Sequence, residues 1–130
     1  ISPDSKALYH AAAVMVSNQI VALADMGTVL LVKCGFSEAA AAEALSPLLL
    51  GNAQSVAEKG AVNALTGPIE RGDAQTVSKH LQEIRKFAAE STVGQDILTA
   101  YTALSKQLIR IAQQKHPQKD YKHLEKELEQ

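Results

Sequence analysis

The sequence predicts an all-α fold, and three features indicate this class. Alanine and leucine dominate the apolar residues, and both favour helix. Aromatic residues make up only 4 % of the chain. Apolar side chains also recur at spacings of three and four, the period of an amphipathic helix. At 130 residues and 46 % hydrophobic content, the chain is long enough to bury one core. We therefore expect a single helical domain over residues 1–130.

The N-terminal segment predicts one long central helix. Ser2 and Asp4 offer capping side chains, and Pro3 suits a helix start. No breaker follows before Gly35, apart from a tolerated Gly27, so the helix would run for roughly 30 residues, about 45 Å. It is apolar on nearly every face and therefore needs cover on all sides. We expect neighbouring protein, including a second subunit, to enclose it.

Shorter helices are expected in the middle of the chain. The second runs from Ser37 to Leu45 and the third from Pro47 to Lys59, with a break or kink between them because proline disfavours helix in the residue before it. Gly60 ends the third helix. Residues 61–73 are predicted to form a loop with one short helical turn.

Two amphipathic helices and a tail complete the chain. Asp73 caps a fourth helix over residues 74–89, and a fifth runs over residues 93–115 until His116-Pro117 stops it. The charged tail, residues 117–130, is predicted to dock as a short amphipathic helix. The expected buried stripes are Val77, Leu81, Ile84 and Ala88, then Ile97, Tyr101, Leu104, Leu108 and Ile111, then Tyr121, Leu124 and Leu128.

Charge and cysteine content narrow the function classes. The net charge of -1 supplies no basic field for nucleic acid or an anionic membrane. Polar groups such as His10, Ser17, Asn18 and Asp25 interrupt the long apolar run, so a membrane span is disfavoured. The single cysteine, Cys34, cannot form an internal disulfide, and we expect a reducing, cytoplasmic setting. We interpret it as a packing residue in preference to a catalytic thiol.

Common cofactor and metal motifs are missing from the chain. The glycines stand apart, so no G-x-G-x-x-G fingerprint or P-loop occurs, and there is no C-x-x-C or H-E-x-x-H pattern. We therefore expect this chain alone to bind neither a nucleotide cofactor nor a metal.

Polar residues on the first helix are the leading site candidates. Lys6 and His10 are four residues apart, His10 and Ser17 are seven apart, and Asn18 is adjacent, so the group lies near one face. A substrate-facing stripe, with His10 as acid/base or hydrogen-bond donor, is one interpretation. Satisfied hydrogen bonds between helices are the other.

A second candidate is the compact loop that contains Thr66-Gly67-Pro68 and Arg71-Gly72-Asp73. Arg71 is suited to grip a carboxylate or phosphate, with Thr66 and Gly67 beside it. Turn chemistry and the cap of the fourth helix would require much of the same composition.

These segments resemble a specific family. The stretches are Lys6–Val14, Ser17-Asn18, Ala64–Ile69 and Arg71–Asp73, and the resemblance covers about Ser5 to Ile84. They are similar to the C-terminal domain called domain of unknown function 2520. The resemblance implies a helical domain of the 6-phosphogluconate dehydrogenase C-terminal type that follows a Rossmann domain and commonly forms the dimer interface. It also implies kinship with ketopantoate reductase and pyrroline-5-carboxylate reductase.

The resemblance also implies a site in the cleft between the two domains. Several relatives place a lysine and an asparagine four apart on the first helix. Asn18 matches the asparagine, whereas Val14 occupies the lysine position, and His10 is a conceivable substitute. NAD(P) would be held by the Rossmann domain, and the chain is expected to be a fragment that begins where that domain ends.

Three functions follow from these observations. The chain is expected to be the substrate-side and dimerisation domain of an NAD(P)-dependent oxidoreductase, inactive alone. The alternative is a non-catalytic helical dimerisation module. A helical adaptor for a protein partner ranks last, because no peptide-binding groove is specified. The substrate-side interpretation requires the first helix to be continuous and His10 and Asn18 to face a cavity.

Overall fold

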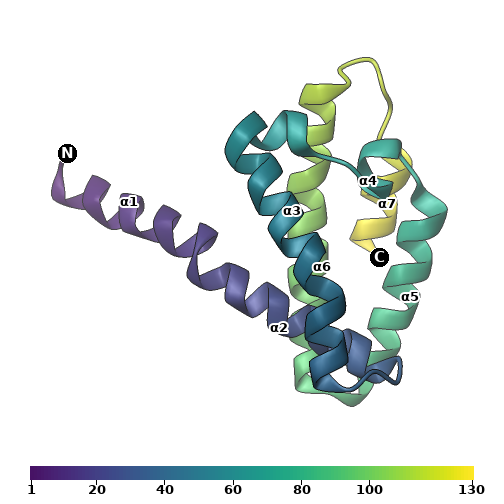
Figure 1. Cartoon of the computed structure of the whole chain (residues 1–130). Coiled ribbons are helices and arrows are strands. Elements are labelled where there is room, and N and C mark those ends of the chain that lie inside the picture. The colour runs from purple at the N-terminus through teal and green to yellow at the C-terminus, as the bar shows by residue number, and fades with distance from the viewer. The chain divides into compact units, whose positions relative to one another are not determined.

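The computed structural model describes residues 1–130 and confirms the all-α prediction, with seven helices and no strand (Figure 1). Contacts divide the chain into two compact units, Ile1–Ala53 and Gln54–Gln130, and each is described by itself. The helices are α1 (Pro3–Val16), α2 (Asn18–Lys33), α3 (Glu38–Ala64), α4 (Pro68–Arg71), α5 (Ala74–Glu90), α6 (Thr92–Lys115) and α7 (Lys122–Glu129). Residues of α3 up to Ala53 belong to the first unit. The single-domain assignment stays a prediction.

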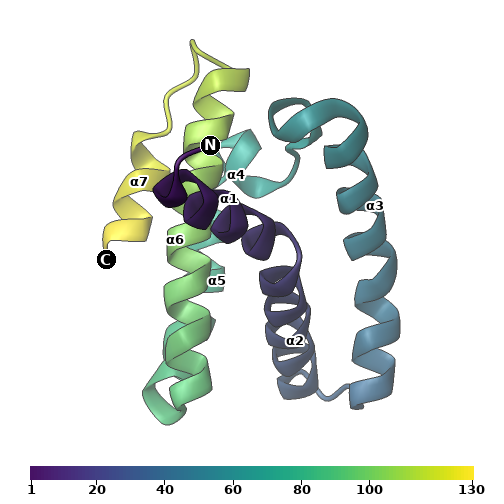
Figure 2. The same ribbon diagram turned by 90° about the vertical axis from the view of Figure 1, so that its left-hand side faces the viewer.

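The long N-terminal helix is interrupted, which corrects the prediction of one continuous element. Ser17 stands between α1 and α2 with φ -117° and ψ -73°, and Figure 2 shows the helix axis changing direction there. The Ser17 backbone N–H bonds the carbonyl of Val14, three residues back, and its hydroxyl donates to the carbonyl of Ala13 at 2.6 Å. A serine side chain that competes for backbone carbonyls in this way bends helices.

The N-terminal helices are largely exposed within the single chain, and their enclosure by a second subunit stays a prediction. Neither α1 nor α2 contains a buried residue. Leu8, Val16 and Val21 each retain at least 70 % of their accessible surface. Scattered apolar side chains on a surface are ordinary, but a run of this length is not. The chain by itself therefore leaves a long apolar surface open.

A tight turn joins α2 to α3. The N–H groups of Gly35 and Phe36 bond the carbonyls of Val32 and Leu31 at 2.9 and 3.2 Å, and Gly35 has φ 100°. This is the Schellman arrangement, which favours glycine at the left-handed position. The prediction that Gly35 ends the first helical segment is confirmed.

The predicted break at Ser46-Pro47 is wrong, because α3 runs through it with Pro47 inside the helix, whereas the alternative of a kink stays a prediction. Proline removes the helical hydrogen bond to the carbonyl four residues back, that of Glu43. Glu43 is exposed, so water can satisfy this carbonyl. The predicted helix end at Gly60 is confirmed, because this residue leaves helical geometry at φ 81° and ψ 166°.

The second unit has a well-formed core. In both views α5, α6 and α7 lie side by side, and all three pairs are in contact. The α5 stripe and the tail stripe are buried as predicted. The central cluster consists of Leu65, Ile69, Val77, Leu81, Ile109, Ala112, Tyr121, Leu124 and Leu128.

The buried stripe of α6 is shifted from the predicted one. Ile97 is buried as expected, but Leu104 is 43 % exposed, and Tyr101, Leu108 and Ile111 are only partly buried. The buried positions are Gly94, Ile97, Ser105, Ile109 and Ala112. The stripe shifts because α6 packs against three helices, α4, α5 and α7, so its contact face is wider than a single stripe. Glycine is required at position 94, because an added Cβ would lie 2.6 Å from the carbonyl oxygen of Phe87.

Candidate functional site

The segment Leu65–Asp73 contains the predicted loop site and is built around one helical turn. Leu65 and Ile69 are buried and anchor it in the core. Gly67 and Gly72 flank α4 with φ 98° and 72°, values that favour glycine. The N–H groups of Gly72 and Asp73 bond the carbonyls of Ile69 and Pro68 at 3.0 and 2.9 Å and close the turn. The predicted short helical turn is therefore confirmed, whereas residues 61–64 belong to α3 and not to the predicted loop.

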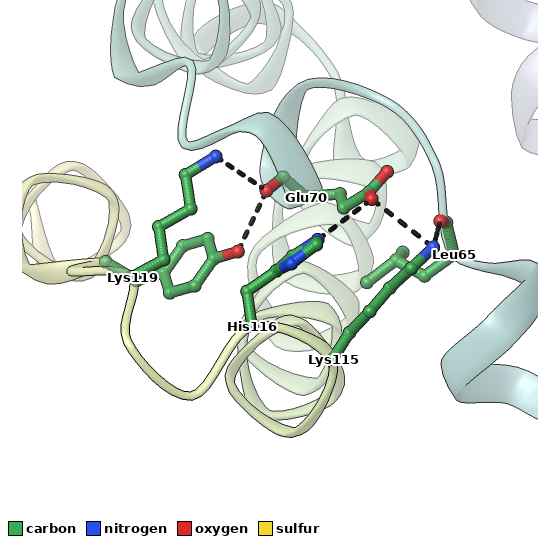
Figure 3. A network of polar contacts seen from close by, with 6 residues as sticks. Leu65, Glu70, Lys115, His116 and Lys119 are labelled. Carbon is green, nitrogen blue, oxygen red and sulfur yellow. Dashed lines mark hydrogen bonds and ion pairs between the residues drawn. The ribbon is translucent and has the colours of Figure 1, made fainter.

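The Glu70 carboxylate is the centre of a polar network in this segment (Figure 3). Its Oε1 atom lies 3.1 Å from Nε2 of His116 and 3.3 Å from Nζ of Lys115. The Lys115 ammonium also donates to the carbonyl oxygen of Leu65 at 2.8 Å. The carboxylate of Glu70 is only 19 % exposed, and a partly desolvated charge of this kind needs such partners.

The Glu70 backbone carbonyl holds two further contacts. The Tyr121 hydroxyl donates to it at 2.8 Å, and Nζ of Lys119 donates at 3.3 Å. Nζ of Lys119 also lies 5.9 Å from the centre of the Tyr121 ring. Residues 115–121 therefore contact both the side chain and the main chain of one residue in α4.

This environment shifts two ionisation equilibria. The hydrogen bond from His116, followed by the bond and charge of Lys115, holds the pKa of Glu70 below its ordinary value, although partial burial opposes the shift. Burial, helped by the Glu70 charge, raises the pKa of Tyr121. Tyr121 therefore serves here as a protonated hydrogen-bond donor.

The outer face of the segment carries the predicted ligand-binding residues. Thr66 is exposed, and the Arg71 side chain is 62 % exposed. The nearest carboxylate oxygen, Oδ2 of Asp73, is 4.0 Å from Arg71 and accepts a bond from the Thr76 hydroxyl at 2.7 Å. Because Asp73 is engaged as the cap of α5, the Arg71 guanidinium retains donors that can meet an anion.

The site candidates on α1 and α2 are arranged differently from the prediction. Lys6 and His10 are exposed, and their side chains make no hydrogen bond or ion pair within the chain. Ser17 and Asn18 are also exposed, and the Ser17 hydroxyl lies 3.2 Å from Oδ1 of Asn18. The two best-formed hollows of the structure are lined by residues of α5, α6 and the C-terminal segment and by none of these four residues. In the isolated chain they face solvent, so the cavity that their predicted role requires is missing from the first unit. The role itself stays a prediction.

The Glu70 network could not be found by reading motifs along the sequence. The partners of Glu70 lie 45 to 51 residues further along the chain. In the sequence, Lys115 was only the last residue of a predicted helix, and His116 was part of its stop signal. The C-terminal segment holds as many carboxylates as lysines, so its composition gave no signal of a distant acidic partner.

Several titratable and nucleophilic side chains lie outside the Glu70 network. No group of His, Cys, Asp and Glu is arranged to hold a metal ion. His80 and Tyr101 share a 2.9 Å hydrogen bond between α5 and α6. Cys34 is exposed, so it does not serve as a packing residue in the chain by itself.

One helical stretch, Pro3–Lys33, is long and apolar enough to cross a membrane by length and composition, and none of its most apolar window is buried.

Comparison with known families decides the kinship of the chain. A family model described as Domain of unknown function (DUF2520) matches residues 1–108. The chain belongs to the DUF2520 family. The match includes α1 to α5, the Leu65–Asp73 segment and most of α6, and it ends before Lys115 and His116. No curated protein and no solved structure matches this DUF2520 domain.

Proposed function

We propose that this DUF2520 chain is the substrate-side and dimerisation domain of an NAD(P)-dependent oxidoreductase, whose Rossmann domain would bind the nucleotide. The single observation that carries the dimerisation part is the open apolar surface of α1 and α2. Burying a valine or leucine side chain contributes about 1.5–3 kcal/mol, and α1 and α2 present several that are largely exposed. A second copy of the chain is the partner that the family resemblance suggests.

The chain alone meets neither requirement of the substrate-side part, because the first helix is interrupted at Ser17 and both His10 and Asn18 are exposed. This part of the proposal therefore depends on the Rossmann domain or a second copy of the chain to complete a cleft around these polar groups. His10 and Lys6 are free to bond a ligand or partner, because neither is engaged within the chain. Thr66, Gly67 and Arg71 would contribute an anion-binding edge. The same proposal places the protein in the cytoplasm.

A non-catalytic dimerisation module is the second candidate, and one observation favours it. Val14 occupies the position where, by the family resemblance, related reductases carry a lysine. His10→Ala and Asn18→Ala in the full-length protein separate the two candidates. Loss of turnover with unchanged folding supports the reductase assignment, whereas unchanged turnover supports the structural module.

Sedimentation of the chain tests the dimer directly. We expect residues 1–130 to sediment as a dimer at tens of micromolar, and Val16→Asp and Val21→Asp to shift the population to monomer. Val93→Asp is the matched control, because Val93 is a half-exposed valine on α6 in the other unit. It should leave the dimer intact.

Three results would contradict the dimer. The first is a wild-type monomer at this concentration, and the second is equal dissociation by the Val93 control. The third is flotation of the wild-type monomer with phosphatidylcholine vesicles, which would assign the apolar helices to a membrane instead.

A further inference from the structure

Few interactions within the segment Leu65–Asp73 stabilise its conformation. Its helix, α4, is a single turn, and one turn fixes many dihedral angles for few hydrogen bonds. Gly67 and Gly72 on either side are the residues with the most backbone freedom to lose. The order of the segment must therefore come from contacts with the rest of the second unit.

Residues 115–121 supply polar contacts at both ends of this segment. Nζ of Lys115 reaches Leu65 at its start and Glu70 within α4. His116 binds the same Glu70 oxygen, and Lys119 and Tyr121 bind the Glu70 carbonyl (Figure 3). The Lys119 side chain also lies over Gly72, where an added Cβ would be 3.3 Å from its Cε atom.

The Leu65–Asp73 segment and residues 115–121 fall on different sides of the point where the family match ends. Leu65, Glu70 and Gly72 lie inside the part of the chain that the DUF2520 model matches, whereas residues 115–121 lie beyond its end at residue 108. A segment inside the matched region is thus held by side chains from beyond the end of the match.

We propose that residues 115–121 form a C-terminal clamp that fixes the conformation of the Leu65–Asp73 segment. Lys115 and His116 act as positioning residues through the Glu70 carboxylate, and Lys119 and Tyr121 act through its carbonyl. The clamp holds α4 so that Arg71 remains on the outer face while Ile69 remains in the core. This inference concerns the order of the segment and does not depend on the proposed oxidoreductase function.

The competing account is that burial of Leu65 and Ile69 alone orders the segment, and that the polar contacts only satisfy groups that water would otherwise satisfy. The two accounts differ in one measurable quantity, the local opening of the segment relative to the opening of the α5 and α6 core. Amide hydrogen exchange reports both quantities in the same sample.

Hydrogen exchange is therefore measured on the full chain and on Lys115→Met. This variant keeps a long unbranched side chain and removes both bonds of the ammonium. Lys86→Met is the matched control, because Lys86 forms an exposed ion pair with Glu83 on α5. We expect exchange of the amides of residues 66–73 to rise about tenfold or more in Lys115→Met, the effect of roughly one lost strong contact. Amides of Val77–Ile84 and Ile97–Ile109 should change much less, and the control should change neither region.

A milder variant keeps the test decisive if Lys115→Met does not fold. Lys119→Met removes one long bond from an exposed side chain and should increase exchange of residues 66–73 by a smaller factor. Unchanged exchange in this segment in whichever variant folds would overturn the clamp. A uniform rise across the segment, α5 and α6 would overturn it too, because that pattern reports global destabilisation only.

Discussion

Oε1 of Glu70 lies 3.1 Å from Nε2 of His116, and this contact joins the one-turn helix α4 to the end of α6 across 46 residues of sequence. The same oxygen meets the Lys115 ammonium at 3.3 Å. One carboxylate inside the family-matched region is therefore paired with two basic side chains that follow this region. Substitution of Lys115 or His116 should therefore affect the Leu65–Asp73 segment, although these residues are far apart in the sequence.

Stability of the second unit should fall in acid partly through Glu70. The native contacts lower the pKa of this carboxyl, so its contribution is present above the unfolded pKa and is lost as pH falls through the folded one. Urea denaturation from pH 6 down to pH 3 should show a falling midpoint for the wild type and a shallower fall for Glu70→Gln. Asp73 contributes a slope of the same sign, because bonds from Thr76 lower its pKa. Equal pH slopes in the wild type and Glu70→Gln would refute the Glu70 contribution.

Gly94→Ala should destabilise the second unit by about 1–3 kcal/mol through overpacking. The new methyl group would lie 2.6–2.8 Å from backbone atoms of Phe87 and Ala88, which cannot move as a flexible side chain can. Gln95→Ala, an exposed neighbour in the same helix turn, is the control and should be nearly neutral. Urea melts of the two variants provide the comparison, and similar midpoints would contradict the close α5–α6 approach.

Leu124→Ala should cost about 2–5 kcal/mol of unfolding free energy, because its side chain is fully buried in the core. Lys126→Ala on the exposed face of α7 should cost little. Thermal melts followed by circular dichroism will distinguish them. If the two variants melted together, α7 would not be docked on the core in solution.

Ser91→Ala should lower stability by about 1 kcal/mol by removing the cap of α6, where the Ser91 hydroxyl accepts from the Gly94 N–H at 3.3 Å. Ser91→Asp retains a capping oxygen at the same place and should restore most of the loss. Denaturant midpoints of the three proteins test this, and a Ser91→Asp midpoint no higher than that of Ser91→Ala would argue against a capping role.

The helical class and most helix boundaries were determined by local chemistry that a sequence displays directly. Gly35 and Gly60 end helices because their backbones adopt positive φ, and Asp73 caps α5 with its own side chain. The stripe of Val77 and Leu81 is buried because one face of α5 meets the core. Each of these features depends on residues within one or two helical turns, so residue type and spacing in the sequence were enough to predict it.

Tertiary structure decided most of the remaining features, because they depend on which distant groups meet. The interruption at Ser17 is a local exception, because its hydroxyl bonds the Ala13 carbonyl four residues back, and Pro47 is accommodated because α3 is exposed there. The α6 stripe shifted because three helices pack on it. The Glu70 network joins residues that no helical period relates. Local propensity acts over a few residues, whereas burial and charge pairing are settled only when the folded chain brings remote side chains together.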